Sequence, residues 1–138
     1  MDSVLIKSKV FDQLIDELSN REKEQGGILG CGSDGVISAF FRDPGRDSCP
    51  GKYIPDTAVL NELIEEWSSR GITFCGIIHT HTNGRCTLTE ADLEYGKRII
   101  DCFPYIEHLF LPLLVNGTLY FYSIDRAGVC TSFVPEIV

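Results

Sequence analysis

The stretch Ile72-Thr-Phe-Cys-Gly-Ile-Ile-His-Thr-His81 joins a short apolar run to two histidines, and the rest of the chain is interpreted from it. Its β-branched and aromatic residues are typical of a buried strand. Residues i and i+2 of a strand project to the same face of a sheet. We therefore predict that His79 and His81 place their imidazoles side by side at the end of this strand.

A second polar group follows after the turn-rich segment 82–88. Thr89 has the features of a helix N-cap, and Asp92 then falls in the first helical turn. Two histidines and one carboxylate form a three-ligand set, which in catalytic zinc sites leaves a fourth tetrahedral position open. Such a metal activates water and polarises a carbonyl oxygen. The pattern therefore predicts a metal site of His79, His81 and Asp92 that hydrolyses an amide-like bond.

Each of these signals also has a simpler interpretation. Two histidines on a strand can be half-buried residues bonded to the backbone, and Thr89 with Asp92 can be a helix cap alone. Ligand type by itself does not separate zinc from non-haem iron. Cys86, inside the loop, could supply a thiolate to the open position or act as a redox switch; the alternative is an ordinary loop cysteine. His108, at the head of a later strand, is expected to pack rather than to bind metal.

A general base is found in the run Glu24-Gln-Gly-Gly-Ile-Leu-Gly30, where a carboxylate precedes the start of a short apolar strand. Glu22 is an alternative occupant of this role. With Glu24 included, the chain resembles the JAMM (MPN+) metalloproteases. Their pattern is Glu, then His-x-His, seven residues, Ser, two residues and Asp. Thr89 stands where the family has serine, and this is the one departure within the pattern.

The resemblance implies roles for five residues. Glu24 would be the catalytic acid and base; His79, His81 and Asp92 would bind Zn²⁺; and Thr89 would help to stabilise the oxyanion. A threonine keeps the hydroxyl donor of serine but adds a methyl group that restricts its rotamer. The metal assignment does not depend on that hydroxyl.

The resemblance also implies a fold and a substrate class. The expected fold is an α/β MPN (JAB) domain, with a mixed curved sheet flanked by helices and an architecture related to cytidine-deaminase-like folds. The expected substrate is the C-terminal tail of a ubiquitin-like or sulfur-carrier protein, as in compact stand-alone prokaryotic members. An alternative is a non-catalytic MPN scaffold that binds other proteins.

Length and composition limit the remaining possibilities. The 138 residues, 43% of them hydrophobic, predict one globular domain over 1–138. The net charge of −8 argues against a nucleic-acid surface. No apolar run reaches the ~20 residues that a membrane span needs. Six cysteines without a Cys-x-x-Cys pair or a secretion signal predict reduced thiols and a cytoplasmic protein.

Periodicity and turn signals predict the order of the helices and strands. A strand over 109–115 and another over 118–124 should form a hairpin around Asn116-Gly117, because this dipeptide favours a two-residue turn. The remaining predictions are strands over 4–7 and 35–41, a strand that follows Glu24, an irregular loop over 42–53, and helices over 9–20, 56–70 and 89–102, the second capped by Asp56 and stopped by Gly71.

Overall fold

The computed structural model describes residues 3–19, 24–43, 57–81 and 83–138, and all structural statements concern these ranges. They form a mixed α/β fold, which confirms the predicted fold class. The helices are α1 (Ser8–Leu18), α2 (Thr57–Ser69) and α3 (Glu90–Cys102). The strands are β1 (Leu5–Ile6), β2 (Gly26–Cys31), β3 (Ile37–Asp43), β4 (Thr73–Thr80), β5 (His108–Phe110), β6 (Leu113–Val115), β7 (Thr118–Asp125), β8 (Cys130–Phe133) and β9 (Glu136–Ile137).

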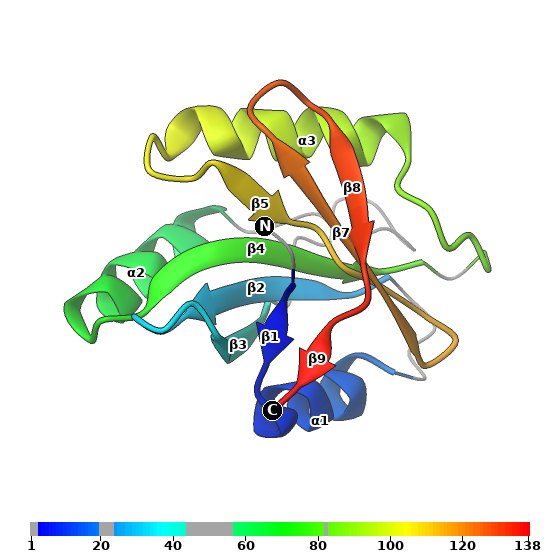
Figure 1. The fold of residues 1–138 in the computed structure, drawn as a ribbon, viewed down its shortest axis with the longest axis horizontal. Helices are drawn as coiled ribbons and strands as arrows, with labels where there is room; N and C mark the ends of the chain where they lie inside the picture. Colours follow the sequence, from blue (N-terminus) through cyan, green and yellow to red (C-terminus); the bar gives the residue numbers. More distant parts are fainter. Residues whose placement is uncertain (1–2, 20–23, 44–56, 82) are drawn as a thin grey trace.

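All the strands in the described ranges belong to one mixed sheet, and Figure 1 shows its strands β4 and β2 side by side. The order across the sheet is β5-β7-β6-β4-β2-β3-β1-β9, and β8 pairs with β7. The central strand β4 is antiparallel to β2 and parallel to β5 and β6. Strand β4 is therefore paired on both sides, as its apolar sequence predicts.

The two faces of the sheet carry separate hydrophobic clusters. Helix α1 buries Leu14 against the first face, where Leu29 of β2 and Ile78 of β4 also lie. Helices α2 and α3 cover the second face, together with Ile28 and Ile77 of the same two strands. Figure 1 shows α1 and α3 on opposite sides of the sheet. The alternation of side chains along β2 and β4 thus supplies both clusters, and each fully buried aliphatic side chain stabilises the fold by about 1.5–3 kcal/mol.

The predicted hairpin around Asn116-Gly117 is present, but its first strand is interrupted. Asn116 and Gly117 have φ values of 51° and 78°, as a two-residue type I′ turn requires. The predicted strand 109–115 is split into β5 and β6, with Pro112 between them. Proline has no N–H to donate to a neighbouring strand. Its carbonyl still accepts a hydrogen bond from the His79 N–H at 3.3 Å, so the chain continues alongside β4.

The other predicted elements differ from the structure mainly at their ends. The predicted helix 9–20 is Ser8–Leu18, and the predicted strand 35–41 is Ile37–Asp43, which includes the first two residues of the predicted loop. The rest of the irregular loop to residue 53 and the predicted Asp56 cap lie outside the described residues. Gly71 follows the second helix with φ of 76°, in the left-handed region that favours glycine at a helix end.

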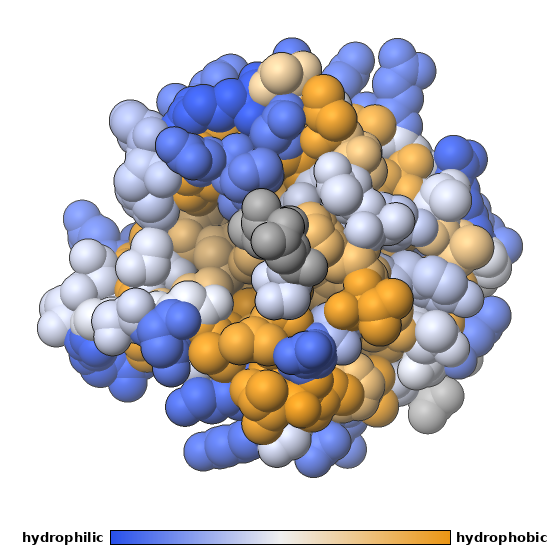
Figure 2. All heavy atoms as spheres, in the orientation of Figure 1, coloured by the Kyte–Doolittle hydropathy of each residue, from blue (hydrophilic) through white to orange (hydrophobic). Residues whose placement is uncertain are grey.

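Strands β8 and β9, near the end of the chain, were not predicted from the sequence. Several hydrophobic side chains in and next to these strands lie at the surface: Val134 is 89% exposed, Ile137 49% and Val138 57%. Figure 2 shows hydrophobic residues gathered over the part of the sheet where β1 and β9 lie. None of the helices in the described ranges has the length and apolar character that crossing a membrane requires.

Candidate metal centre

His79 and His81 stand at the carboxyl end of β4, on the face covered by α2 and α3. His79 pairs with Gly26 of β2 on one side and with Leu113 of β6 on the other. The N–H of His81, just past the strand, donates to the carbonyl of Leu114 at 3.4 Å. The backbone of His79 is therefore held from both sides and that of His81 from the β6 side, and the two rings lie 4.8 Å apart between centroids. This confirms the prediction that the imidazoles lie side by side.

Asp92 reaches these rings from the first turn of α3, because a capping box fixes its position. The Thr89 hydroxyl oxygen accepts a hydrogen bond from the Asp92 N–H at 3.1 Å, and Asp92 Oδ2 accepts one from the Thr89 N–H at 2.9 Å. Such reciprocal bonds satisfy two of the free N–H groups at a helix start. The predicted N-cap is confirmed, and it also orients the carboxylate.

The three side chains bring their ligand atoms within 4.8 Å of one another. The two Nε2 atoms of His79 and His81 lie 3.1 Å apart. Asp92 Oδ1 lies 3.3 Å from the His79 Nε2, and Asp92 Oδ2 lies 3.4 Å from the His81 Nε2. Around a tetrahedral zinc with bonds of about 2.0–2.2 Å, neighbouring ligand atoms are separated by roughly 3.3–3.6 Å. The arrangement therefore fits a zinc ion, and it could hold other divalent metals with the same geometry.

The loop after His81 orients its ring. The His81 Nδ1 lies 2.9 Å from the carbonyl oxygen of Arg85, which can only accept, so in the neutral ring Nδ1 carries the proton and Nε2 has the lone pair that could bind a metal. A hydrogen bond of this kind fixes the tautomer of a metal-binding histidine. The next carbonyl, that of Cys86, accepts from the Tyr122 hydroxyl at 2.5 Å, so β7 holds the loop in place. The contributions of Arg85 and Tyr122 were not predicted, because a backbone acceptor leaves no side-chain signal in the sequence.

The electrostatics of the cluster favour an ionised carboxylate. Burial alone would raise the pKa of Asp92, but the hydrogen bond and charge of His79, with two hydrogen bonds from Thr89, hold the pKa well below its usual range. Asp92 is therefore ionised at neutral pH, the state in which a carboxylate binds a cation.

Glu24 lies just before β2, and the strand register places it near the cluster. Gly26 pairs with His79, and the Thr80 N–H donates to the carbonyl of Gln25 at 2.9 Å. Continuing this antiparallel register by one residue places Glu24 across from His81, and residues directly opposite each other share a face. Glu24 is half-buried and is not among the clustered ligand atoms. Its role as the base stays a prediction.

Three further predictions concern residues around the cluster. The thiol of Cys86 does not belong to the three-residue cluster, so the described structure gives no support to a thiolate ligand. Thr89 uses its hydroxyl oxygen as an acceptor in the cap, and the hydroxyl proton stays available for donation. The expected packing of His108 is wrong, because its side chain is exposed at the start of β5.

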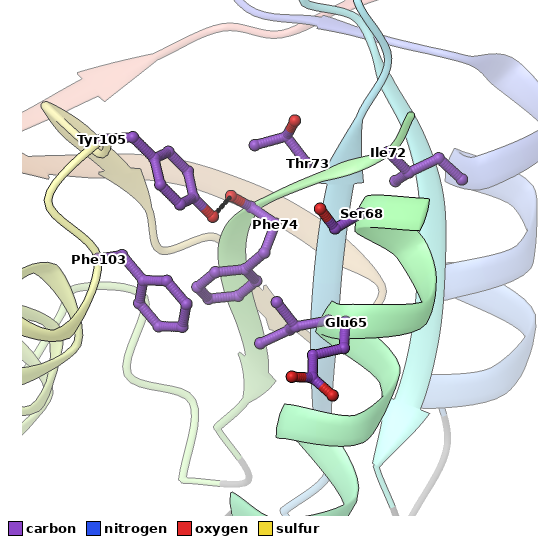
Figure 3. A pocket seen from close by; sticks show the side chains of 8 residues that line it. Glu65, Ser68, Ile72, Thr73, Phe74, Phe103 and Tyr105 are labelled. Atoms are coloured by element: carbon purple, nitrogen blue, oxygen red, sulfur yellow. Dashed lines mark hydrogen bonds between the residues drawn. The ribbon is translucent and has the colours of Figure 1, made fainter. Parts of the chain in front are cut away.

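A cavity of about 540 Å³ lies at the other end of β4, where the strand begins. Figure 3 shows the aromatic rings of Phe74, Phe103 and Tyr105 on one side of it and Glu65 and Ser68 of α2 on the other. The Tyr105 hydroxyl donates to the carbonyl of Phe74 at 3.2 Å. The residues that line this cavity do not include His79, His81 or Asp92, so the cavity is not part of the metal cluster.

Comparison with known proteins supports the fold. No protein-family profile matches the chain, and no curated protein matches it. The solution structure of protein DSY2949 from Desulfitobacterium hafniense aligns with a TM-score of 0.68 and 14% identity, covering 97% of this chain and 94% of that one. The crystal structure of AF2198, a JAB1/MPN domain protein from Archaeoglobus fulgidus, aligns with a TM-score of 0.59 and 15% identity, covering 100% of both chains. The chain therefore has the fold of a JAB1/MPN domain.

Proposed function

We propose that this protein is a zinc-dependent peptidase or isopeptidase of the JAMM type. The observation that carries the proposal is the cluster of His79, His81 and Asp92, whose ligand atoms are 3.1–3.4 Å apart, close to the separation of roughly 3.3–3.6 Å in tetrahedral coordination. The cluster occurs on a fold shared with a JAB1/MPN domain protein. The register of β2 against β4 supports Glu24 as the nearby carboxylate.

A zinc ion bound here would supply a Lewis acid that polarises the substrate carbonyl and activates water for attack. In the proposed reaction the Glu24 carboxylate accepts a proton from the attacking water and later delivers it to the leaving amine. The Thr89 hydroxyl has a proton that the helix cap does not use, and it can donate this proton to the developing oxyanion. His79, His81 and Asp92 are then the metal ligands and take no part in proton transfer.

The proposed substrate is the C-terminal tail of a ubiquitin-like or sulfur-carrier protein, in the cytoplasm. Support for this class is the match of the motif, from Glu24 to Asp92, to the JAMM pattern. An extended tail can bind by adding a strand to a sheet edge, which leaves its final amide bond free to enter a site at a strand end. The proposed site lies at such a strand end, where β4 is followed by the loop after His81.

The test combines metal content with cleavage of a defined reporter. Protein purified with added zinc should contain about one zinc per chain, and it should hydrolyse a ubiquitin-like protein whose C-terminus is linked to a fluorophore. Glu24→Ala should keep the zinc but lower the cleavage rate by ~10²-fold or more, because general-base catalysis contributes that much.

Matched variants make this test specific. Glu107→Ala removes an exposed carboxylate outside the cluster and should leave the cleavage rate unchanged. Loss of activity in Glu22→Ala instead of Glu24→Ala would transfer the base assignment to Glu22. A protein that binds one zinc but cleaves none of the tail-linked reporters would contradict the peptidase proposal and favour a scaffold.

A further inference from the structure

Two cysteines face each other across neighbouring strands, away from the metal cluster. Cys31 ends β2, Cys75 lies in the first half of β4, and their sulfur atoms are only 2.8 Å apart. Both are free thiols and both are partly exposed. A disulfide bond is about 2.05 Å long, so these sulfurs need to approach by less than about 1 Å to become bonded.

A β-bulge in β4 brings the two cysteines together. Along β2 the pairing passes from Leu29 to Gly30, whereas along β4 it passes from Gly76 to Phe74 and omits Cys75. Cys75 is therefore the extra residue of a bulge, which changes the face to which a side chain points. Regular alternation would have placed Cys75 with Ile77 beneath α2 and α3. The bulge places it instead with the cluster on the α1 side.

Cys31 lies on that same α1 side of the sheet, because it is two residues after Leu29 along a strand. Cys75 is further held by a hydrogen bond from its thiol to the carbonyl oxygen of Leu29 on β2, at 3.5 Å. Both thiols therefore lie on strands of the sheet, and neither depends on a loop for its position.

We propose that Cys31 and Cys75 are a dithiol site that low-molecular-weight disulfides, such as oxidised glutathione, convert into an intramolecular disulfide. This function is independent of the metal site. The two sites are half the length of β4 apart and lie on opposite faces of the sheet.

The two thiols have distinct roles in the reaction. The hydrogen bond with Cys75 lowers the pKa of the Cys31 thiol, although burial and the charge of Asp34 oppose this. Burial, and then the same bond, raise the pKa of Cys75 well above its ordinary value. The Cys31 thiolate therefore attacks the external disulfide, forms a mixed disulfide and releases one thiolate. Cys75 then loses its proton and displaces the second thiolate, so one external disulfide is reduced to two thiols while the protein loses two hydrogens.

The product would join β2 covalently to β4 and close the loop that contains β3 and α2. Closing a loop of this length restricts the unfolded chain more than a short loop does, and stability rises accordingly. The disulfide form should therefore unfold at a temperature higher by at least about 5 °C, and a reductant should reverse the shift.

The experiment uses the wild-type chain equilibrated with oxidised glutathione, blocked with N-ethylmaleimide and digested for mass spectrometry. The expected product is a peptide pair linked through Cys31 and Cys75, accompanied by the rise in unfolding temperature. Cys75→Ala should instead accumulate a stable glutathione adduct on Cys31, because the neighbouring thiol that would displace the glutathione is absent. Cys102→Ala, a change at an exposed cysteine, should leave the linked pair unchanged.

Several outcomes would overturn the proposal. Maleimide on both Cys31 and Cys75 of the wild type after full equilibration would show that no bond forms between them. A bond from either residue to a different cysteine would show that the 2.8 Å pair is not the reactive one. Because mapping of the wild type needs no variant to fold, the result does not depend on the stability of Cys75→Ala.

Discussion

The two ends of β4 bring reactive side chains together by opposite means. At the carboxyl end, regular pairing with β2 and β6 keeps His79 and His81 on one face, where Asp92 of α3 meets them. Toward the amino end, irregular pairing moves Cys75 to the other face, where it meets Cys31. Alternation along a strand therefore identifies neighbours only where the pairing is regular, and a bulge creates a pair that alternation does not indicate.

The two ends also differ in the range of the contacts that build them. The metal end depends on short-range rules, namely side-chain alternation along a strand and a capping box at a helix start. The cysteine pair depends on the register of two strands far apart in the sequence. The following experiments separate the two ends, beginning with the largest expected effect.

Removal of one proposed metal ligand should abolish tight zinc binding while leaving the cysteine end intact. His81→Ala should weaken zinc affinity by at least about 100-fold, because loss of an outer-shell partner alone costs 10–100-fold. Titration with zinc under a competing chelator measures the change. His108→Ala, which removes an exposed histidine, is the matched control and should bind zinc as the wild type does. Equal affinity in His81→Ala would contradict the assigned ligand set.

A substitution at Gly76 tests the segment of β4 between Cys75 and His79. A Cβ at this position would lie 2.7 Å from the backbone oxygen of Phe110, so Gly76→Ala should push β5 away from β4. Overpacking against backbone costs about 1–3 kcal/mol, and we expect unfolding free energy to fall by about 2 kcal/mol. Chemical denaturation measures this. At Gly32, an added Cβ would meet a side-chain oxygen of Asp34 at 3.0 Å and no backbone atom within 4 Å among its nearest neighbours, so Gly32→Ala should be milder.

Most of the metal cluster could be predicted from the sequence. The imidazoles of His79 and His81 and the carboxylate of Asp92 do gather, because each is placed by a rule that spans only a few residues. The turn at Asn116-Gly117 was predictable for the same reason, since its two positive φ values favour these residue types. The mixed α/β class followed from such local signals.

The contacts that depend on distant pairing could not be predicted. The sequence predicts reduced thiols but does not single out Cys31 and Cys75 as a pair, because neither lies in a cysteine motif. Gly76 was the one available signal, since an isolated glycine within a strand often marks a bulge. The interruption at Pro112 had a similar signal in the proline itself. Strand β8, which is mostly exposed, had no such signal, because it lacks the alternation of apolar and polar residues that is typical of a half-buried strand.

The capping box at the metal end should contribute a smaller effect on stability and a measurable one on catalysis. Thr89→Ala removes the acceptor of the Asp92 N–H and should lower the unfolding free energy by about 1 kcal/mol. It should also slow reporter cleavage with substrate binding retained, as expected for a group that assists the transition state. Thr89→Ser keeps both the cap and the hydroxyl and should behave as the wild type. A normal cleavage rate in Thr89→Ala would remove threonine from the proposed mechanism.

The smallest effect is expected at the cysteine end, in the rate at which Cys31 is alkylated. The hydrogen bond with Cys75 lowers the pKa of Cys31, so more thiolate is present at pH 7 than for an ordinary thiol. Cys75→Ala removes that bond; the pKa should rise, and alkylation of Cys31 by iodoacetamide at pH 7 should slow by a few-fold. Asp34→Asn removes a charge that raises the pKa of Cys31, so alkylation of Cys31 should be faster in this variant than in the wild type.

The measurement is the pH profile of alkylation at Cys31, read by mass spectrometry, because the midpoint of the profile is independent of steric access. The midpoint should be displaced to higher pH in Cys75→Ala and to lower pH in Asp34→Asn. Equal midpoints in all three proteins would mean that the two sulfurs, 2.8 Å apart, do not share a hydrogen bond in solution. Zinc affinity should be the same in the three proteins, since neither substitution touches the carboxyl end of β4.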